Sequence, residues 1–178
     1  MTQTESEYKQ VIALCKDVFE KKTKDYGTAW RILRLPSITD QILIKAQRIR
    51  SIQEKGSQKV EEDIKNEFIG IINYSIIAII QESLSENAPL EIPVEDLMPK
   101  YDHAAEETLE LLLNKNHDYG EAWRDMRVSS ITDIILMKLY RVKQIEDNKG
   151  KTLISEPVKA NYQDMINYAV FCLIKLKE

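Results

Sequence analysis

The segment Asp25-Tyr-Gly-Thr-Ala-Trp-Arg31 returns later in the chain as Asp118-Tyr-Gly-Glu-Ala-Trp-Arg124. The next segment, Ser37-Ile-Thr-Asp-Gln-Ile-Leu43, returns as Ser130-Ile-Thr-Asp-Ile-Ile-Leu136. At one constant offset, 16 of the 28 residues in 25–52 are identical to those in 118–145, where unrelated sequences would share roughly two. The chain is therefore a tandem duplication, and a site in one copy is expected to have a counterpart in the other.

Each copy has three stretches with the apolar periodicity of amphipathic helices and none that is typical of a strand. We expect helices at about 5–24, 37–56 and 60–84, then at 101–117, 130–149 and 156–177. Ser37 to Asp40 form an Asp version of a capping box, which predicts that the second helix begins at Ser37. The segment 87–99 carries three prolines and indicates a linker between a first unit, 1–86, and a second unit, 100–178.

A three-helix unit is too thin to bury its own apolar faces. The predicted fold is therefore all-α: a tandem pseudo-two-fold repeat of a three-helix unit, packed into one helical bundle. The two copies mimic a dimer within one chain, and we expect the third helices to lie near the axis. A homo-oligomer of such chains remains open.

The composition narrows the class of protein. Of the 178 residues, 43% are hydrophobic and 30% charged, with a net charge of −4, which disfavours a dedicated nucleic-acid binder. The first residues lack the pattern of a signal peptide, and the most apolar stretch, 68–80, is too short to cross a bilayer. We expect a cytoplasmic protein with no membrane partner, in which Cys15 and Cys172 are buried, reduced thiols.

A lysine interrupts the apolar stripe of the second helix in both copies. In the first copy, Lys45 lies between Ile42 and Ile49, and in the second Lys138 takes its place. A cation there needs an anionic partner or a route to solvent, so we expect each lysine to reach a carboxylate of the third helix. Two interpretations stay open: a structural salt bridge, or phosphate binding by Lys45, Arg48, Lys138 and Arg141.

Acidic residues gather on one side of the third helix. Oxygen ligands of this kind, together with substrate phosphates, are what Mg²⁺ prefers, so the candidate metal ligands are Glu62, Glu67, Glu156 and Asp164. Each copy keeps only one acid of an i, i+3 pair, because Glu67 and Gly70 align with Asn161 and Asp164. The two halves could build one composite site, with Glu67 and Asp164 meeting across the axis. Alternatively, the polar side is only a seam between the repeats.

The repeated turn supplies aromatic rings. Tyr26, Trp30, Tyr119 and Trp123 could stack on a nucleotide base. The alternative is that the tryptophans only close the ends of the bundle.

These motifs together resemble the nucleotide modification associated domain 1 family, which is similar to the MazG-like all-α nucleotide pyrophosphohydrolases. The resemblance is carried by 22–27, Trp30, 45–48 and 62–74, and again by 115–120, Trp123, 138–141 and 156–168. It covers nearly the whole chain outside the linker. It implies Mg²⁺ held by acidic helices and release of pyrophosphate from a nucleoside triphosphate, but the acidic motifs are incomplete in this chain.

The sequence therefore predicts a nucleotide-binding protein, with Mg²⁺-dependent (deoxy)nucleoside triphosphate pyrophosphohydrolysis as the candidate enzymatic activity. The alternative is a non-catalytic nucleotide-sensing or protein-interaction module that kept the fold and lost the metal ligands.

Overall fold

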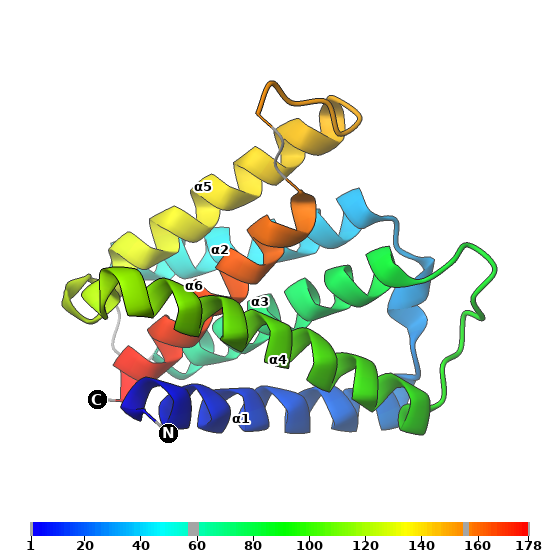
Figure 1. Cartoon of the computed structure of the whole chain (residues 1–178), viewed down its shortest axis with the longest axis horizontal. Helices are drawn as coiled ribbons and strands as arrows, with labels where there is room; N and C mark the ends of the chain where they lie inside the picture. The colour runs from blue at the N-terminus through cyan, green and yellow to red at the C-terminus, as the bar shows by residue number, and fades with distance from the viewer. Residues whose placement is uncertain (1, 57–60, 155–156, 178) are drawn as a thin grey trace.

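The computed structural model describes residues 2–56, 61–154 and 157–177, without the side chains of Glu61, Glu62, Asp118 and Tyr119. Within these ranges the chain forms six α-helices, two short 3-10 helices and no strand (Figure 1). The first copy contains α1 (Gln3–Tyr26), η1 (Ala29–Ile32), α2 (Leu35–Lys55) and α3 (Glu61–Ser83). The second contains α4 (Val94–Tyr119), η3 (Ala122–Asp125), α5 (Val128–Asp147) and α6 (Val158–Lys177). The all-α prediction is confirmed.

The second helix of each copy begins earlier than predicted. Helix α2 starts at Leu35, where the N-cap residue Arg34 makes no side-chain capping bond, so the prediction of a capping box at Ser37 was wrong. Pro36 lies in the first turn, where its missing N–H costs no helical hydrogen bond. The carboxylate of Asp40 instead accepts a hydrogen bond from Lys143 Nζ at 3.0 Å.

The first helix of the second copy also begins early. Helix α4 starts at Val94, inside the segment expected to be a linker, and Pro99 lies within the helix. The extra turns lengthen the face that α4 packs against α1 and α3.

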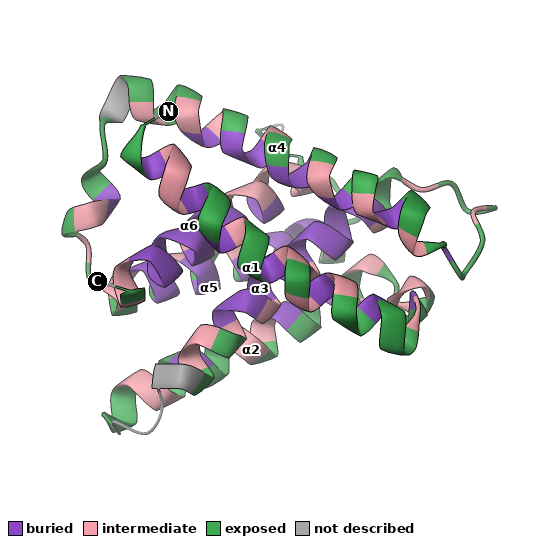
Figure 2. Cartoon of the chain, turned by 90° about the horizontal axis from the view of Figure 1, so that it is seen from below, coloured by how far each residue is buried: buried purple, intermediate pink, exposed green. Residues whose placement is uncertain are grey.

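The helices form three layers of two (Figure 1). Helices α1 and α4 pack together in one outer layer, and α2 and α5 in the other. Helices α3 and α6 lie between them and pack against each other. Figure 2 shows that buried surface is concentrated on α3 and α6 and on the inner stripes of the outer helices. The central pair supplies the most apolar segments of the sequence, such as Phe68–Ile80.

Reciprocal contacts show that the two copies are related by an approximate two-fold axis. The Tyr8 hydroxyl donates to Asn167 Oδ1 at 3.0 Å, and the equivalent Tyr101 hydroxyl donates to Asn73 Oδ1 at 2.8 Å. Lys143 pairs with Asp40 at 3.0 Å, and at the equivalent positions of the other copy Arg50 pairs with Asp133 at 3.6 Å. In an isologous interface, residue i of one unit contacts j of the other and j contacts i. The predicted pseudo-two-fold bundle, with the third helices at its centre, is confirmed.

Two further expectations concern the cysteines and the length of the apolar helices. Cys15 and Cys172 are both free and buried, as expected. In the ranges that the structure describes, every helix is too short or too polar to span a bilayer.

Candidate functional site

A cleft of about 700 Å³ opens in the first copy between α1, η1, α2 and α3. Its volume falls in the range of small-molecule sites, about 300–1,000 Å³. Residues that recur in both copies line it, namely Lys22, Tyr26, Gly27, Trp30, Lys45, Asn73 and Tyr74, and Gly70 lies among them. Another cavity, of about 550 Å³, is lined by residues of α3, α4 and α6 and includes none of these motif residues.

The Asp-Tyr-Gly turn shapes one wall of the cleft. Gly27 ends α1 with φ of 63°, a conformation that favours glycine, and its N–H donates to Thr23 O at 2.8 Å. The carboxylate of Glu91, from the segment between the copies, lies directly against Gly27 and accepts from Thr28 N at 3.3 Å. A side chain at Gly27 would strain the backbone at this φ and would displace the Glu91 carboxylate. It leaves Tyr26 with 73% of its surface exposed beside the cleft.

Lys45 crosses the opposite wall. Its neighbours on the α2 stripe, Ile42 and Ile49, are fully buried, so the lysine stem runs from the core toward the cleft. It passes over Gly70 so closely that a Cβ added there would lie 2.8 Å from Lys45 Cδ. The Nζ atom lies 3.7 Å from Glu67 Oε2 and 5.6 Å from the centre of the Tyr74 ring. Gly70 is therefore required for this path of Lys45.

Arg48 lies behind Lys45 and holds the acidic side of α3. Its guanidinium is 2.7 Å from Glu67 Oε1 and 3.7 Å from Asp63 Oδ2. Arg48 is not among the residues that line the cleft.

The second copy arranges its ion pairs differently. Lys138 Nζ lies 3.1 Å from Asp164 Oδ2, and Lys115 Nζ lies 2.9 Å from Asp164 Oδ1. Together with the contact between Lys45 and Glu67, this confirms that each stripe lysine reaches a third-helix carboxylate. Asn161, the counterpart of Glu67, is buried, and neither its amide nitrogen nor its oxygen has a hydrogen-bond partner in the described structure. Arg141 is half-buried on α5.

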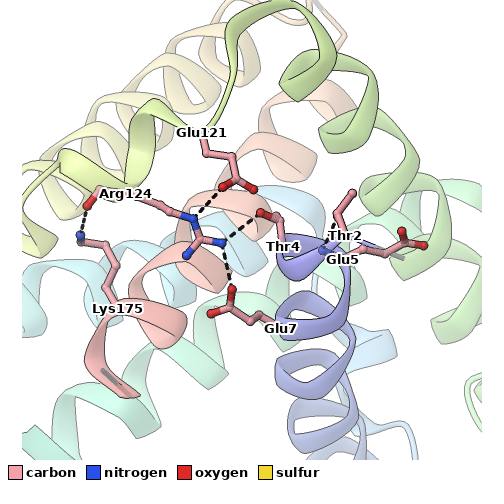
Figure 3. A network of polar contacts seen from close by, with 7 residues as sticks. All are labelled: Thr2, Thr4, Glu5, Glu7, Glu121, Arg124 and Lys175. Carbon is pink, nitrogen blue, oxygen red and sulfur yellow. Dashed lines mark hydrogen bonds and ion pairs between the residues drawn. The ribbon is translucent and has the colours of Figure 1, made fainter.

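The aromatic end of the second copy is closed. Trp123 is 5% exposed and lies parallel to Phe171, with ring centroids 4.3 Å apart and an interplanar angle of 3°. The Arg124 guanidinium lies 4.3 Å from the indole centre. Figure 3 shows how Arg124 is held: its guanidinium donates to Glu7 at 2.9 Å, to Thr4 at 3.0 Å and to Glu121 at 2.8 Å. Trp123, which we expected to face a base, is packed inside the protein.

The equivalent arginine of the first copy has different hydrogen-bond partners. Arg31 donates to Gln81 and to the carbonyls of Ala88 at 3.0 Å and Pro89 at 3.2 Å. It therefore ties the segment between the copies to η1. Trp30 is only partly buried and lines the cleft.

Of the four candidate metal ligands, the side chains of Glu67 and Asp164 lie within the described structure. The Glu62 side chain and Glu156 lie outside the described residues, as does the Tyr119 side chain. Glu67 and Asp164 each contact cations of their own copy, an arrangement that favours two separate sites over one composite site. In the part of the chain that is described, no group of three or more His, Cys, Asp or Glu side chains could hold a metal ion.

The family profile described as nucleotide modification associated domain 1 matches residues 22–81 and 115–176. The two matches cover more than half of the chain and fall one in each copy. The chain belongs to the nucleotide modification associated domain 1 family. Each match begins at the lysine of the first helix, Lys22 or Lys115, and includes the turn, the second helix and the acidic third helix. No curated protein and no solved structure matches the chain significantly.

Two lining residues were missed by the sequence-based assignment of site residues. Lys22 recurs as Lys115, and this recurrence was the available signal that the position matters. The sequence did not single out Gly70 as a site residue, because the repeat alignment shows it only as a position where the first copy lacks the acid of the second, Asp164. The role of Gly70 depends on the path of Lys45 across α3, which the sequence does not reveal.

Proposed function

We propose that this protein binds a nucleotide in the cleft of its first repeat. The observation that carries the proposal is the lining of that cleft, which combines two lysines with two aromatic rings open to solvent. Phosphate groups are recognised by cations, and nucleotide bases by aromatic faces. A cleft with both features in one concave site has the chemistry that a nucleotide needs.

The two lysines would hold the phosphates. Lys22 is exposed and makes no ion pair with another described residue. Lys45 makes a long ion-pair contact of 3.7 Å to Glu67 and lies over the Tyr74 ring. Positive charge in a partly enclosed site attracts an anion more strongly than the same charge in open solvent. Tyr26 and Trp30 would contact the base.

Hydrolysis is the second candidate activity, and it would need a pair of acidic side chains that can hold Mg²⁺. Asp63 and Glu67 are one turn apart on α3, and Arg48 contacts both. If a nucleotide drew Arg48 away, these carboxylates could bind Mg²⁺, as the likeness to MazG-like pyrophosphohydrolases implies. As the side chains lie, however, both Glu67 oxygens already contact cations. The described carboxylates therefore do not fit a Mg²⁺ site, and binding is the better supported function.

Calorimetric titration with a panel of ribo- and deoxyribonucleoside triphosphates, with and without Mg²⁺, tests the binding proposal. We expect Lys22→Met and Lys45→Met to weaken binding at least tenfold each. Lys24→Met is the matched control, because Lys24 lies on the same helix, is exposed and pairs with Glu20. Binding that is absent in the wild type, or that survives both lysine changes, would refute the proposal.

A pyrophosphate-release assay on the same panel separates the two activities. Release that depends on Mg²⁺ and is lost in Glu67→Gln would support the enzyme. Binding without release from any triphosphate would support the non-catalytic module.

A further inference from the structure

Among the cleft-lining positions that differ between the two copies, two carry a larger side chain that contacts the repeated motifs of the second copy. Gly70 of α3 aligns with Asp164 of α6, and seven residues later Ile77 aligns with Phe171. In both cases the second copy has the larger side chain, and both larger side chains contact motif residues of their own copy.

Asp164 occupies the space between two lysines. Each of its carboxylate oxygens contacts one of them, Lys115 at 2.9 Å and Lys138 at 3.1 Å. The equivalent lysines of the first copy, Lys22 and Lys45, both line the cleft, and the residue at the equivalent position is Gly70. The first copy therefore has the two cations of this site and lacks the anion that joins them.

Phe171 contacts the tryptophan of the second copy, as Asp164 contacts its lysines. Its ring lies flat on the Trp123 indole, at an interplanar angle of 3°. In the first copy Trp30 and the smaller Ile77 both line the cleft. This copy has the tryptophan and lacks the planar ring that stacks on it.

We propose that Asp164 and Phe171 are internal substitutes for the anionic group and the planar ring of the ligand that the first copy binds. The ligand then places an anionic group beside Gly70, between Lys22 and Lys45, and a ring against Trp30. The second copy is filled by its own side chains, so each chain binds one ligand. The identity of the ring as a nucleotide base rests on the function proposed above.

The spacing of the two substitutes gives the ligand a length. Seven residues of an α-helix span about 10 Å. A base linked through its sugar to two or three phosphates reaches that distance with its terminal phosphate, whereas a nucleoside monophosphate is too short. The expected ligand is a nucleoside di- or triphosphate held by its terminal phosphate.

The anion position can be tested without any nucleotide. Gly70→Asp should place a carboxylate between Lys22 and Lys45, whereas Gly70→Asn has the same shape and no charge. Both changes make Lys45 shift, because its stem lies within 3 Å of the new Cβ. At low salt we expect the Asp variant to melt about 2–4 °C above the Asn variant. The difference should shrink when Lys22 is also changed to Met, because only the pair with Lys45 then remains. An Asp variant no more stable than the Asn variant would overturn the anion position.

Stoichiometry tests the substitution itself. Calorimetry with a nucleoside triphosphate should give one site per wild-type chain and at least a tenfold loss of affinity in Gly70→Asp/Ile77→Phe. The reverse variant, Asp164→Gly/Phe171→Ile, should gain a second site. Circular dichroism establishes that each variant is folded. If one double variant fails to fold, the number of sites or the affinity measured for the other still tests whether Asp164 and Phe171 take the place of the ligand.

The outcomes separate this inference from the proposed function. Two sites in the wild type would overturn the inference and leave nucleotide binding standing. If the wild type binds no nucleotide, the proposed function fails, and the comparison of Gly70→Asp with Gly70→Asn still decides whether the anion position exists.

Discussion

The rings of Trp123 and Phe171 lie parallel, with centroids 4.3 Å apart, at the place where the equivalent residues of the first repeat, Trp30 and Ile77, line a cleft. The equivalent tryptophans of the two copies, Trp30 and Trp123, thus have different surroundings in one chain. In the second copy the tryptophan is part of the core, and in the first copy it lines a cleft open to solvent. The two copies differ beside this tryptophan, where Ile77 of the first aligns with Phe171 of the second.

Replacing the ring of Phe171 by a smaller aliphatic side chain should destabilise the protein. We expect Phe171→Leu to lower the free energy of unfolding by about 1–3 kcal/mol, because it removes a stacked pair and leaves a cavity. The matched change in the first copy, Ile77→Val, should cost about 0.5–1.5 kcal/mol. Urea denaturation of both variants measures the difference. A smaller loss for Phe171→Leu than for Ile77→Val would show that the stack contributes little.

The two reciprocal tyrosines should contribute equally to stability. Tyr8→Phe and Tyr101→Phe each leave an asparagine oxygen near the axis without its donor, which costs about 1–3 kcal/mol. Tyr140→Phe is the control, since this tyrosine is 52% exposed and should change stability by less than about 0.5 kcal/mol. Chemical denaturation of the three variants makes the comparison. Clearly unequal losses for Tyr8 and Tyr101 would argue against the two-fold relationship.

The sequence predicts those features of the fold and site that depend on local patterns and on the need to bury apolar faces. The pseudo-two-fold bundle and the ion pairs of Lys45 and Lys138 were predictable, because duplicated apolar stripes need a partner and a lysine in such a stripe needs an anion. The start of α2 could have been found from Pro36, which is favoured in the first turn of a helix. The Ser-x-x-Asp pattern predicted a start at Ser37, two residues after the observed one.

The closure of the second site could not be predicted from the sequence. It depends on how α6 is placed against η3, and a sequence pattern carries no information about that contact between distant segments. The difference between Gly70 and Asp164 was visible, but without the path of the lysines it indicated only a weakened metal site.

Glu146 should make the stability depend on pH. Burial raises the pKa of its carboxyl, repulsion from nearby Asp40 and Asp147 adds to this, and the hydrogen bond from Thr39 opposes it. A raised pKa in the folded state means that the folded protein binds the proton more tightly than the unfolded chain. Stability from this group is therefore present at low pH, and it is lost as the pH rises from the ordinary carboxyl pKa through the raised one.

Glu146→Gln is the variant that tests this pH dependence. The first copy has Gln53 at the equivalent position, where it donates to Thr132 Oγ1 at 3.1 Å, so a glutamine fits this environment. Relative to the wild type, the variant should gain stability as the pH rises through that window. Urea denaturation at several pH values measures it, and a difference that stays constant across the window would contradict the prediction.

Both cysteines should be unreactive in the folded protein. Burial raises the pKa of Cys15 to about 12 and also raises that of Cys172, so thiolate is scarce and reagent has no access. At pH 8 we expect negligible labelling by an aromatic disulfide reagent in buffer and two labelled thiols per chain in denaturing urea. Rapid labelling of native protein would show that the core near one cysteine opens readily.

The fluorescence of Trp30 tests the central claim most directly, because the chain contains only two tryptophans. Trp123→Phe leaves Trp30 as the sole reporter in the cleft, and Trp30→Phe leaves only the buried Trp123. Titration of each with a nucleoside triphosphate, excited where the nucleotide does not absorb, should quench Trp30 saturably. Trp123 emission should not change, and Lys45→Met should shift the Trp30 titration to higher concentration. Saturable quenching of Trp123 with an unresponsive Trp30 would contradict the assignment of the site to the first repeat.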